Sequence, residues 1–175
     1  MKTLVLMRHA KSSWDSPGLA DHDRPLNERG REDAPRMGRR LMERGIEPAV
    51  IITSTAERAR STAALVAGEL GIPTERIVAD ERLYAASVDT MLRVIRSLDD
   101  RLECAMLVGH NPEMTDLATR FSRTIEAMPT AAIAVFSLEA ASWADVRPAM
   151  SAGPPAAPPA AVAFDAPDRT HEREW

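Results

Sequence analysis

Short apolar runs that end in polar residues alternate with stretches of helical periodicity along this chain. Residues 3–7, 49–53 and 104–108 are apolar or β-branched and have the length of buried strands. Apolar positions elsewhere recur at helical spacing and predict helices over about 27–44, 54–70, 87–98 and 112–121. An alternation of strands and helices is typical of parallel sheets. The pattern therefore predicts an α/β fold in three layers, a mostly parallel central sheet with helices on both faces.

The C-terminal part of the chain has a different pattern. Residues 131–138 are apolar enough for a further strand, and 143–146 is expected to pair with it. A Pro/Ala-rich extension over 148–175 is expected to be extended or flexible, and to return as an edge strand near 162–164. We therefore predict one domain over residues 1–147, followed by this extension.

Polar side chains follow each of the first three apolar runs. Arg8 and His9 follow the first, Arg58 lies one helical turn beyond the second, and His110 follows the third. Because open α/β sheets bind ligands at the carboxyl ends of their strands, we expect these four side chains to meet at one edge. A single histidine there would more often be a core residue, but two guanidiniums and two imidazoles together are donors for phosphate oxygens. The sequence predicts a pocket for a phosphoryl group.

Composition narrows the classes of protein that fit. The chain has 175 residues, 45% of them hydrophobic and 27% charged, as expected for one soluble domain. A formal net charge of -4 gives no basic surface, which argues against nucleic acid as a partner. The apolar run before Arg8 is too short for a signal segment, and no later stretch could span a membrane, so we expect a cytoplasmic protein. The single Cys104 excludes an internal disulfide and is expected to be a small buried hydrophobe.

Three motifs resemble the signatures of the histidine phosphatase superfamily, which includes the cofactor-dependent phosphoglycerate mutases. They are Arg8-His9-Ala10-Lys11-Ser12, Ser54-x-x-x-Arg58-Ala59-x-x-Thr62 and Val108-Gly109-His110-Asn111-Pro112. The small size, the Asp23-Arg24-Pro25-Leu26 loop and the helix with Ala34, Pro35, Met37 and Gly38 resemble its short branch, the SixA-type phosphohistidine phosphatases. The resemblance implies a phosphoglycerate mutase-like fold and a phosphohistidine phosphatase that needs no metal or cofactor. It implies a phosphohistidine-containing protein as substrate and partner.

The resemblance also implies roles for the four predicted site residues. His9 would be the nucleophile and pass through a covalent phosphohistidine that water hydrolyses, since neutral imidazole is available near pH 7. Arg8 and Arg58 would hold phosphate oxygens, because the planar guanidinium matches them. His110, kept protonated by the phosphate, would donate a further hydrogen bond that strengthens as charge develops.

Three polar residues of the motifs are further candidates for substrate binding: Ser12, Ser54 and Asn111. For two of them a structural role is the stronger interpretation. Ser54 begins a capping-box pattern, and Asn111 followed by Pro112 is typical of the start of a helix.

The general acid has no clear candidate. The mutases supply a glutamate after the second helix, where this chain has Glu81, and a loop aspartate, Asp21 or Asp23, is the other source of a proton. Expelling an alkoxide requires a proton donor, because its conjugate acid is about as weak as water, with a pKa of roughly 15.7. Expelling imidazole requires little help, because its conjugate acid has a pKa of about 6.5. A site without a strong acid therefore favours cleavage of a P–N bond.

Other functions fit parts of this pattern. The first alternative is a phosphatase of small phosphomonoesters or nucleotides, which would hydrolyse aryl phosphates and depend on one of the three acidic candidates. The second is a non-catalytic phosphate-binding module, which would bind without turnover. A metal site formed by His9, His110 and a loop aspartate is disfavoured, since two adjacent guanidiniums would repel a cation.

Overall fold

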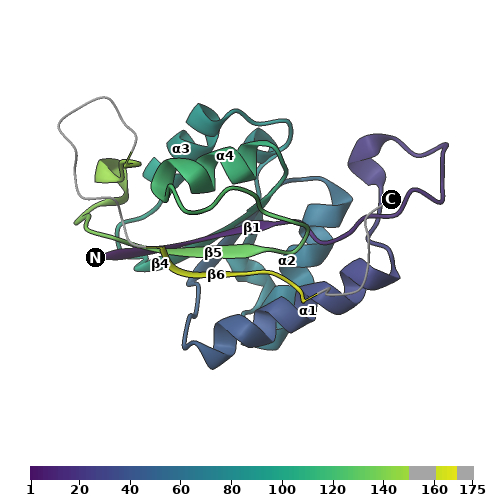
Figure 1. Ribbon diagram of the computed structural model, residues 1–175, viewed down its shortest axis with the longest axis horizontal. Helices are drawn as coiled ribbons and strands as arrows, with labels where there is room; N and C mark the ends of the chain where they lie inside the picture. The colour runs from purple at the N-terminus through teal and green to yellow at the C-terminus, as the bar shows by residue number, and fades with distance from the viewer. Residues whose placement is uncertain (150–160, 169–175) are drawn as a thin grey trace.

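The computed structural model describes residues 1–149 and 161–168, which form a six-stranded sheet with helices on both faces (Figure 1). The sheet order is β3-β2-β4-β1-β5-β6. The strands span Lys2–Arg8 (β1), Val50–Thr53 (β2), Ile77–Ala79 (β3), Cys104–Gly109 (β4), Ile133–Leu138 (β5) and Ala161–Asp165 (β6). The first four are parallel, β5 runs antiparallel to β1, and β6 runs antiparallel to β5. The predicted three-layer α/β fold with a mostly parallel sheet is confirmed.

Four helices cover the sheet, two on each face, as Figure 1 shows for α3 and α4 above it and α1 and α2 below. They span Glu28–Glu43 (α1), Glu57–Leu70 (α2), Val88–Arg96 (α3) and Glu113–Phe121 (α4). Strand β1 serves both faces, because its side chains alternate. Leu4 and Leu6 pack in the core under α3 and α4, while Val5 and Met7 pack in the core with α1 and α2. All four side chains are fully buried, so the sheet has a core on each side.

The register between β1 and β4 determines where the two site histidines fall. Arg8 lies opposite Gly109 in the ladder, and the His9 N–H donates to the Gly109 carbonyl over 2.9 Å. His9 and His110 therefore follow at the same level on neighbouring strands. A shift of one residue would place one of these side chains on the opposite face of the sheet.

Helix α1 is in direct backbone contact with the loop that follows β1. Asn27 caps the helix and accepts a hydrogen bond from the Gly30 N–H over 2.9 Å. The Asn27 N–H in turn donates to the Lys11 carbonyl over 3.0 Å. A Cβ on Gly30 would lie 2.2 Å from that carbonyl oxygen, so only glycine fits this crossing. Pro35 lies inside α1, beyond its first turn.

Two helix starts differ from the predicted positions. Helix α2 begins at Glu57 with Ala56 as its N-cap residue, and the Ser54 hydroxyl accepts from the Ala56 N–H before the helix starts. Helix α4 begins at Glu113 with Pro112 at the N-cap position, and the Asn111–Pro112 peptide bond before it is cis. Neither Ser54 nor Asn111 occupies the N-cap position that the sequence predicted.

The predicted strand at 143–146 is wrong, because Trp143–Asp145 forms a short 3-10 helix. The Ser142 hydroxyl accepts from the Ala144 N–H, and the Trp143 indole N–H donates to the Leu102 carbonyl over 2.8 Å. This anchors the fully buried Trp143 in the core, and β6 takes the place beside β5.

Strand β6 lies at the edge of the sheet, where the sequence suggested an edge strand near 162–164. Asp165 at its end pairs with Arg40 and with Arg44 of α1, the latter over 2.8 Å. Most of the Pro/Ala-rich stretch lies outside the described residues, and the domain boundary at 147 stays a prediction. Over 1–149 and 161–168, no helix is both long and apolar enough to cross a membrane.

Candidate active site

Four side chains meet at the carboxyl ends of the central strands and form what we call the cradle: Arg8, His9, Arg58 and His110. Arg8 ends β1, His9 and His110 directly follow β1 and β4, and Arg58 lies in the first turn of α2. The two imidazole rings have centroids 5.0 Å apart, and the Arg58 Nε lies 3.4 Å from the His9 Nε2. The Arg8 Nη1 donates to the Met128 carbonyl over 3.1 Å. The topology thus gathers two cations and two imidazoles in one place.

His9 is held in one orientation and one tautomer. Its Nδ1 lies 2.7 Å from the Ala10 carbonyl oxygen, which can only accept, so Nδ1 carries the proton and Nε2 keeps its lone pair. The Ala10 N–H donates to the Thr62 hydroxyl over 3.0 Å, which fixes this turn against α2. Burial lowers the pKa of His9 to about 3, although the Ala10 carbonyl opposes the shift. At neutral pH the ring is uncharged, with Nε2 facing Arg58.

His110 is oriented by Ser54. The His110 Nε2 lies 2.8 Å from the Ser54 hydroxyl oxygen, which is itself held by the Ala56 N–H. Burial, followed by the positive charge of Arg58, lowers the pKa of His110 to about 4. His110 is therefore uncharged at neutral pH, and a bound phosphate would have to raise its pKa to give the protonated ring that the resemblance implies.

Asn111 and Ser12 are used elsewhere in the fold. The Asn111 amide donates to the Met128 carbonyl over 3.0 Å, and its oxygen accepts from the Thr115 N–H over 3.1 Å. Ser12 is buried where the chain bridges to Leu26. The described residues show no hydrogen bond from either side chain to the cradle. Ser54 is the one further candidate that the structure brings to these four residues.

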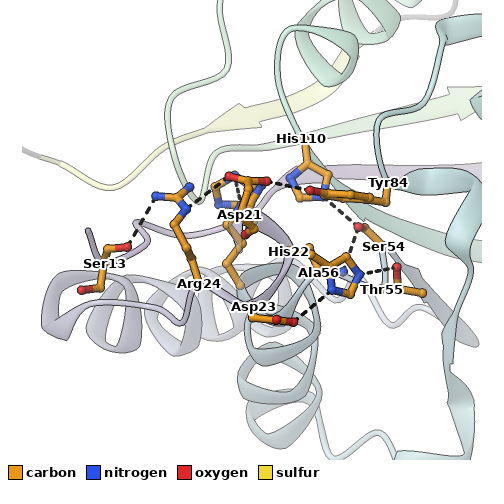
Figure 2. A network of polar contacts seen from close by, with 12 residues as sticks. Ser13, Asp21, His22, Asp23, Arg24, Ser54, Thr55, Ala56, Tyr84 and His110 are labelled. Atoms are coloured by element: carbon orange, nitrogen blue, oxygen red, sulfur yellow. Dashed lines mark hydrogen bonds and ion pairs between the residues drawn. The ribbon is translucent and has the colours of Figure 1, made fainter. Parts of the chain in front are cut away.

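Asp21, on the loop after β1, places its carboxylate against the cradle, beside Tyr84 and Arg24 (Figure 2). Asp21 accepts two hydrogen bonds from Arg58, through its backbone oxygen over 2.7 Å and its Oδ2 over 3.0 Å. Oδ2 also accepts from the Tyr84 hydroxyl over 2.8 Å, and Oδ1 accepts from the Arg24 Nε over 3.2 Å. The Tyr84 hydrogen bond, and then Arg58, lower the pKa of Asp21 to about 2. Asp21 is therefore ionised in this state and holds no proton to donate.

The other two general-acid candidates lie apart from the cradle. Asp23 pairs with His22, its Oδ1 lying 3.3 Å from Nδ1, and 65% of its side chain is exposed. Glu81 is exposed on the short 3-10 helix after β3. In the part of the chain that the structure describes, only Asp21 among the three contacts Arg58.

We call Asp21, His22, Arg24 and Tyr84 the rim of the site. The Tyr84 ring stands edge-on to His22, with centroids 4.8 Å apart at 89°, and to His110, with centroids 5.7 Å apart at 75°. Arg24 stacks on the exposed Trp14 ring, 3.5 Å from its centroid. Of the four rim residues only Asp21 was predicted from the sequence, and His22, Arg24 and Tyr84 were not. The available signal for Tyr84 was its position just after β3, at the same edge of the sheet.

Two further kinds of site were sought among the described residues: a cluster of metal ligands and a reactive cysteine. Within 1–149 and 161–168, no group of three His, Cys, Asp or Glu side chains is placed to hold a metal ion. Burial raises the pKa of the Cys104 thiol to about 11, so it is protonated at neutral pH, as expected for a structural cysteine.

Comparison with known proteins relates the chain to one superfamily. Residues 4–89 match the family model described as "Histidine phosphatase superfamily (branch 1)". An uncharacterised protein of Mycobacterium tuberculosis is 39% identical over 159 residues, covering 83% of this chain and 95% of the relative. A 2,3-bisphosphoglycerate-dependent phosphoglycerate mutase of Thermobifida fusca is 44% identical over 92 residues, covering 49% of this chain and 37% of the mutase.

The fold is also that of a solved structure from Agrobacterium tumefaciens. That protein is described as a candidate phosphohistidine phosphatase SixA, and it is 27% identical to this chain. The two structures superpose with a TM-score of 0.77, covering 95% of this chain and 98% of the other.

Proposed function

The chain belongs to the histidine phosphatase superfamily, and on that premise we propose that it is a phosphohistidine phosphatase acting through a covalent phosphohistidine on His9. Membership itself indicates a hydrolase or transferase of phosphoryl groups. The finer assignment is supported by the likeness to the SixA-type structure and by the chemistry of the site. The substrate would be a protein that carries phosphohistidine, and the reaction would take place in the cytoplasm.

The observation that carries the proposal is the state of His9. Its Nδ1–H is bound to the Ala10 carbonyl, and its Nε2 lone pair faces Arg58 3.4 Å away. This Nε2 attacks the phosphorus, a new P–N bond forms, and the bond to the substrate nitrogen breaks with its electron pair leaving on that nitrogen. Water then attacks the phosphorus of phospho-His9, and the His9 Nε2–P bond breaks to release phosphate. The low pKa of His9 keeps the nucleophile unprotonated at neutral pH.

The rest of the cradle stabilises the phosphoryl group during transfer. Arg58 and Arg8 hold its equatorial oxygens with charge-assisted hydrogen bonds. His110 lies 5.0 Å from His9 between ring centroids and donates once the phosphate has raised its pKa. The Ser54 hydroxyl, 2.8 Å from His110, keeps the second imidazole aimed at the phosphate and acts as a positioning residue.

The acid–base chemistry of the rim favours a P–N substrate. Asp21 is ionised, while Asp23 and Glu81 make no contact with the cradle. An alkoxide leaving group would need a proton from one of them, and an imidazole leaving group would not. None of the three acidic candidates is thus a protonated carboxylic acid at the cradle, which supports phosphohistidine over a sugar phosphate.

The test is single-turnover dephosphorylation of a phosphohistidine protein beside an aryl phosphate, with chelator present. Wild type should release the P–N phosphate rapidly and the aryl phosphate slowly, and His9→Ala should lose on the order of 10⁴-fold or more in rate. An acid-labile phosphoryl group trapped on His9, and located by peptide mass spectrometry, would identify the intermediate. Loss of activity in chelator would contradict the metal-independent mechanism.

The second candidate is a phosphatase of small phosphomonoesters or nucleotides, which the match to the phosphoglycerate mutase favours. Aryl phosphate turnover equal to or faster than P–N turnover would establish it and move the search to small metabolites. Binding of both phosphates with turnover of neither would instead indicate a phosphate-binding module.

A further inference from the structure

The position of the Asp21 carboxylate is not explained by phosphate binding in the cradle. A carboxylate beside a phosphate pocket repels the bound dianion and competes with it for Arg58. Yet Asp21 is held there by three donors, Arg58, Tyr84 and Arg24, at 3.0, 2.8 and 3.2 Å from its carboxylate oxygens. Such an arrangement fixes a negative charge at the mouth of the site.

The position of this charge relates it to the leaving group. His9 lies on the inner side of the cradle, because it directly follows the central strand β1 and is 7% exposed. Asp21 lies on the solvent side, with 52% of its side chain exposed. An in-line transfer requires the leaving atom to lie opposite the nucleophile, on this open side. The carboxylate therefore lies where the leaving group departs.

A fixed anion at this point discriminates between leaving groups. Oxygen leaving groups gain negative charge as the P–O bond breaks, and a neighbouring carboxylate opposes that charge. A phosphorylated imidazole that is protonated on its second nitrogen is a cation, and a carboxylate accepts a charge-assisted hydrogen bond from that N–H and stabilises this form. Cleavage of the P–N bond in this form releases neutral imidazole, whose conjugate acid has a pKa of about 6.5. Tyr84 and His22, whose rings stand edge-on 4.8 Å apart, form an aromatic wall suited to a planar imidazole.

We propose that Asp21 is the specificity-determining residue for the leaving group, accepting a hydrogen bond from the free N–H of the substrate's phosphorylated imidazole. This inference rests on the proposed function and assigns a residue to it. In the transfer step the His9 Nε2–P bond forms, the substrate P–N bond breaks, and its electron pair stays on the leaving nitrogen. The proton on the second nitrogen remains there, hydrogen-bonded to Asp21, so that neutral imidazole leaves without any proton transfer.

The experiment compares Asp21→Asn with wild type on phosphoimidazole and on an aryl phosphate, by stopped-flow single turnover. Asparagine keeps the size of the side chain and removes its charge. We expect the rate with phosphoimidazole to fall about 10- to 100-fold, the effect of one charge-assisted hydrogen bond. The rate with aryl phosphate should hold or rise, because repulsion is removed. The matched control is Asp23→Asn, whose carboxylate pairs with His22, and which should keep the wild-type ratio of the two rates.

A third substrate separates direct contact from an indirect effect. Phosphoimidazole methylated on its second nitrogen has no N–H to donate. Wild type should prefer the N–H substrate over the methylated one by about 10-fold or more, and Asp21→Asn should lose that preference. Differences in intrinsic reactivity cancel, because the same two substrates are compared in both proteins.

The outcomes are distinct for the inference and for the proposed function. If Asp21→Asn lowers both rates by the same factor, or keeps the preference for the N–H substrate, Asp21 merely positions Arg58 and the inference is wrong, while the phosphatase assignment stands. If wild type hydrolyses aryl phosphate but not phosphoimidazole, the proposed function fails and the inference fails with it.

Discussion

The cradle and the rim are built from different parts of the molecule. The cradle residues lie at strand ends and in the first turn of a helix, with His9 7% and Arg58 6% exposed. The rim residues lie on the loop after β1 and on the segment after β3. On the first of these, half of the Asp21 side chain is exposed. The sheet fixes the first set, and hydrogen bonds between loops fix the second.

From this difference we infer that the cradle binds the phosphoryl group and that the rim contacts the leaving group. A phosphoryl group has the same oxygens in every substrate, so the parts that bind it can be buried and rigid. The leaving group differs from one substrate to another, and surface loops can change without disturbing the core. We therefore expect changes in the cradle to affect all substrates equally, and changes in the rim to affect them unequally.

After loss of the proposed nucleophile itself, the largest effect should come from Arg58, which belongs to the cradle and also holds Asp21 of the rim. Arg58→Ala should lower kcat/KM by on the order of 10³-fold for P–N and aryl substrates alike, since it removes donors to the transferring oxygens. Arg58→Lys should restore little, because an ammonium cannot bind two oxygens in a fixed plane. Arg60→Ala, an exposed arginine on the same helix, is the control. A substrate-dependent loss in Arg58→Ala would place this arginine in the rim.

The pH dependence of stability should report on the cradle imidazoles. The pKa values of His9 and His110 are lowered in the folded protein to about 3 and about 4, from 6.5. Below pH 6.5 the unfolded chain therefore binds two protons that the folded chain does not. The free energy of unfolding should fall as the pH drops from 6.5 to about 5, with a limiting slope of about 2.7 kcal/mol per pH unit.

Urea unfolding at several pH values measures this slope, and His9→Gln should roughly halve it. An unchanged slope in His9→Gln would mean that buried imidazoles elsewhere or carboxylates dominate the acid sensitivity.

Tyr84→Phe tests the rim alone. The change removes the hydroxyl that lies 2.8 Å from the Asp21 Oδ2 and keeps both ring contacts. We expect P–N turnover to fall about 3- to 10-fold, the effect of one hydrogen bond, and aryl phosphate turnover to change less. The measurement is steady-state kcat/KM on both substrates. An equal loss on both would show that this rim residue affects all substrates alike, as a cradle residue is expected to do.

The smallest effect should come from a site far from both regions. Asp165 pairs with Arg40 and Arg44, and 14% of its side chain is exposed. Asp165→Ala should lower the free energy of unfolding by about 1 kcal/mol without changing either activity. The control is Asp168→Ala, which also pairs with Arg40 but is 84% exposed and should cost less. Loss of activity in Asp165→Ala would link the C-terminal strand to the site.

The cradle could be predicted from the sequence because each of its residues lies next to an apolar run or in the helix that follows one. Apolar runs that end in Arg8, His9 and His110 indicate parallel strands, and the geometry of such sheets brings their carboxyl ends together. Strands β1, β2, β4 and β5 and the four helices followed from the pattern of apolar positions in the same way, apart from the exact helix starts. Whether these residues act as proposed is a matter for the experiments above.

The rim could not be predicted, because it depends on contacts between segments far apart in the chain. Nothing near Tyr84 in the sequence indicates that its hydroxyl would meet Asp21, 63 residues away. The capping box at Ser54 failed for a similar reason: a tertiary contact with His110 places the hydroxyl ahead of the helix start. Trp143 was assigned to a strand by hydrophobicity, and a buried anchor at Leu102 held it in a 3-10 turn.

At Gly30, where helix α1 crosses the loop after β1, the addition of one methyl group would disturb the backbone that carries the site. A Cβ there would lie 2.2 Å from the Lys11 carbonyl oxygen, two residues beyond His9 and ten before Asp21. Helix α1 and the loop would have to separate, so Gly30→Ala would displace both His9, the proposed nucleophile, and Asp21, the proposed leaving-group residue. A substitution at residue 30 can thus abolish activity although this residue contacts no substrate. A search for harmful variants that is restricted to site residues would miss it.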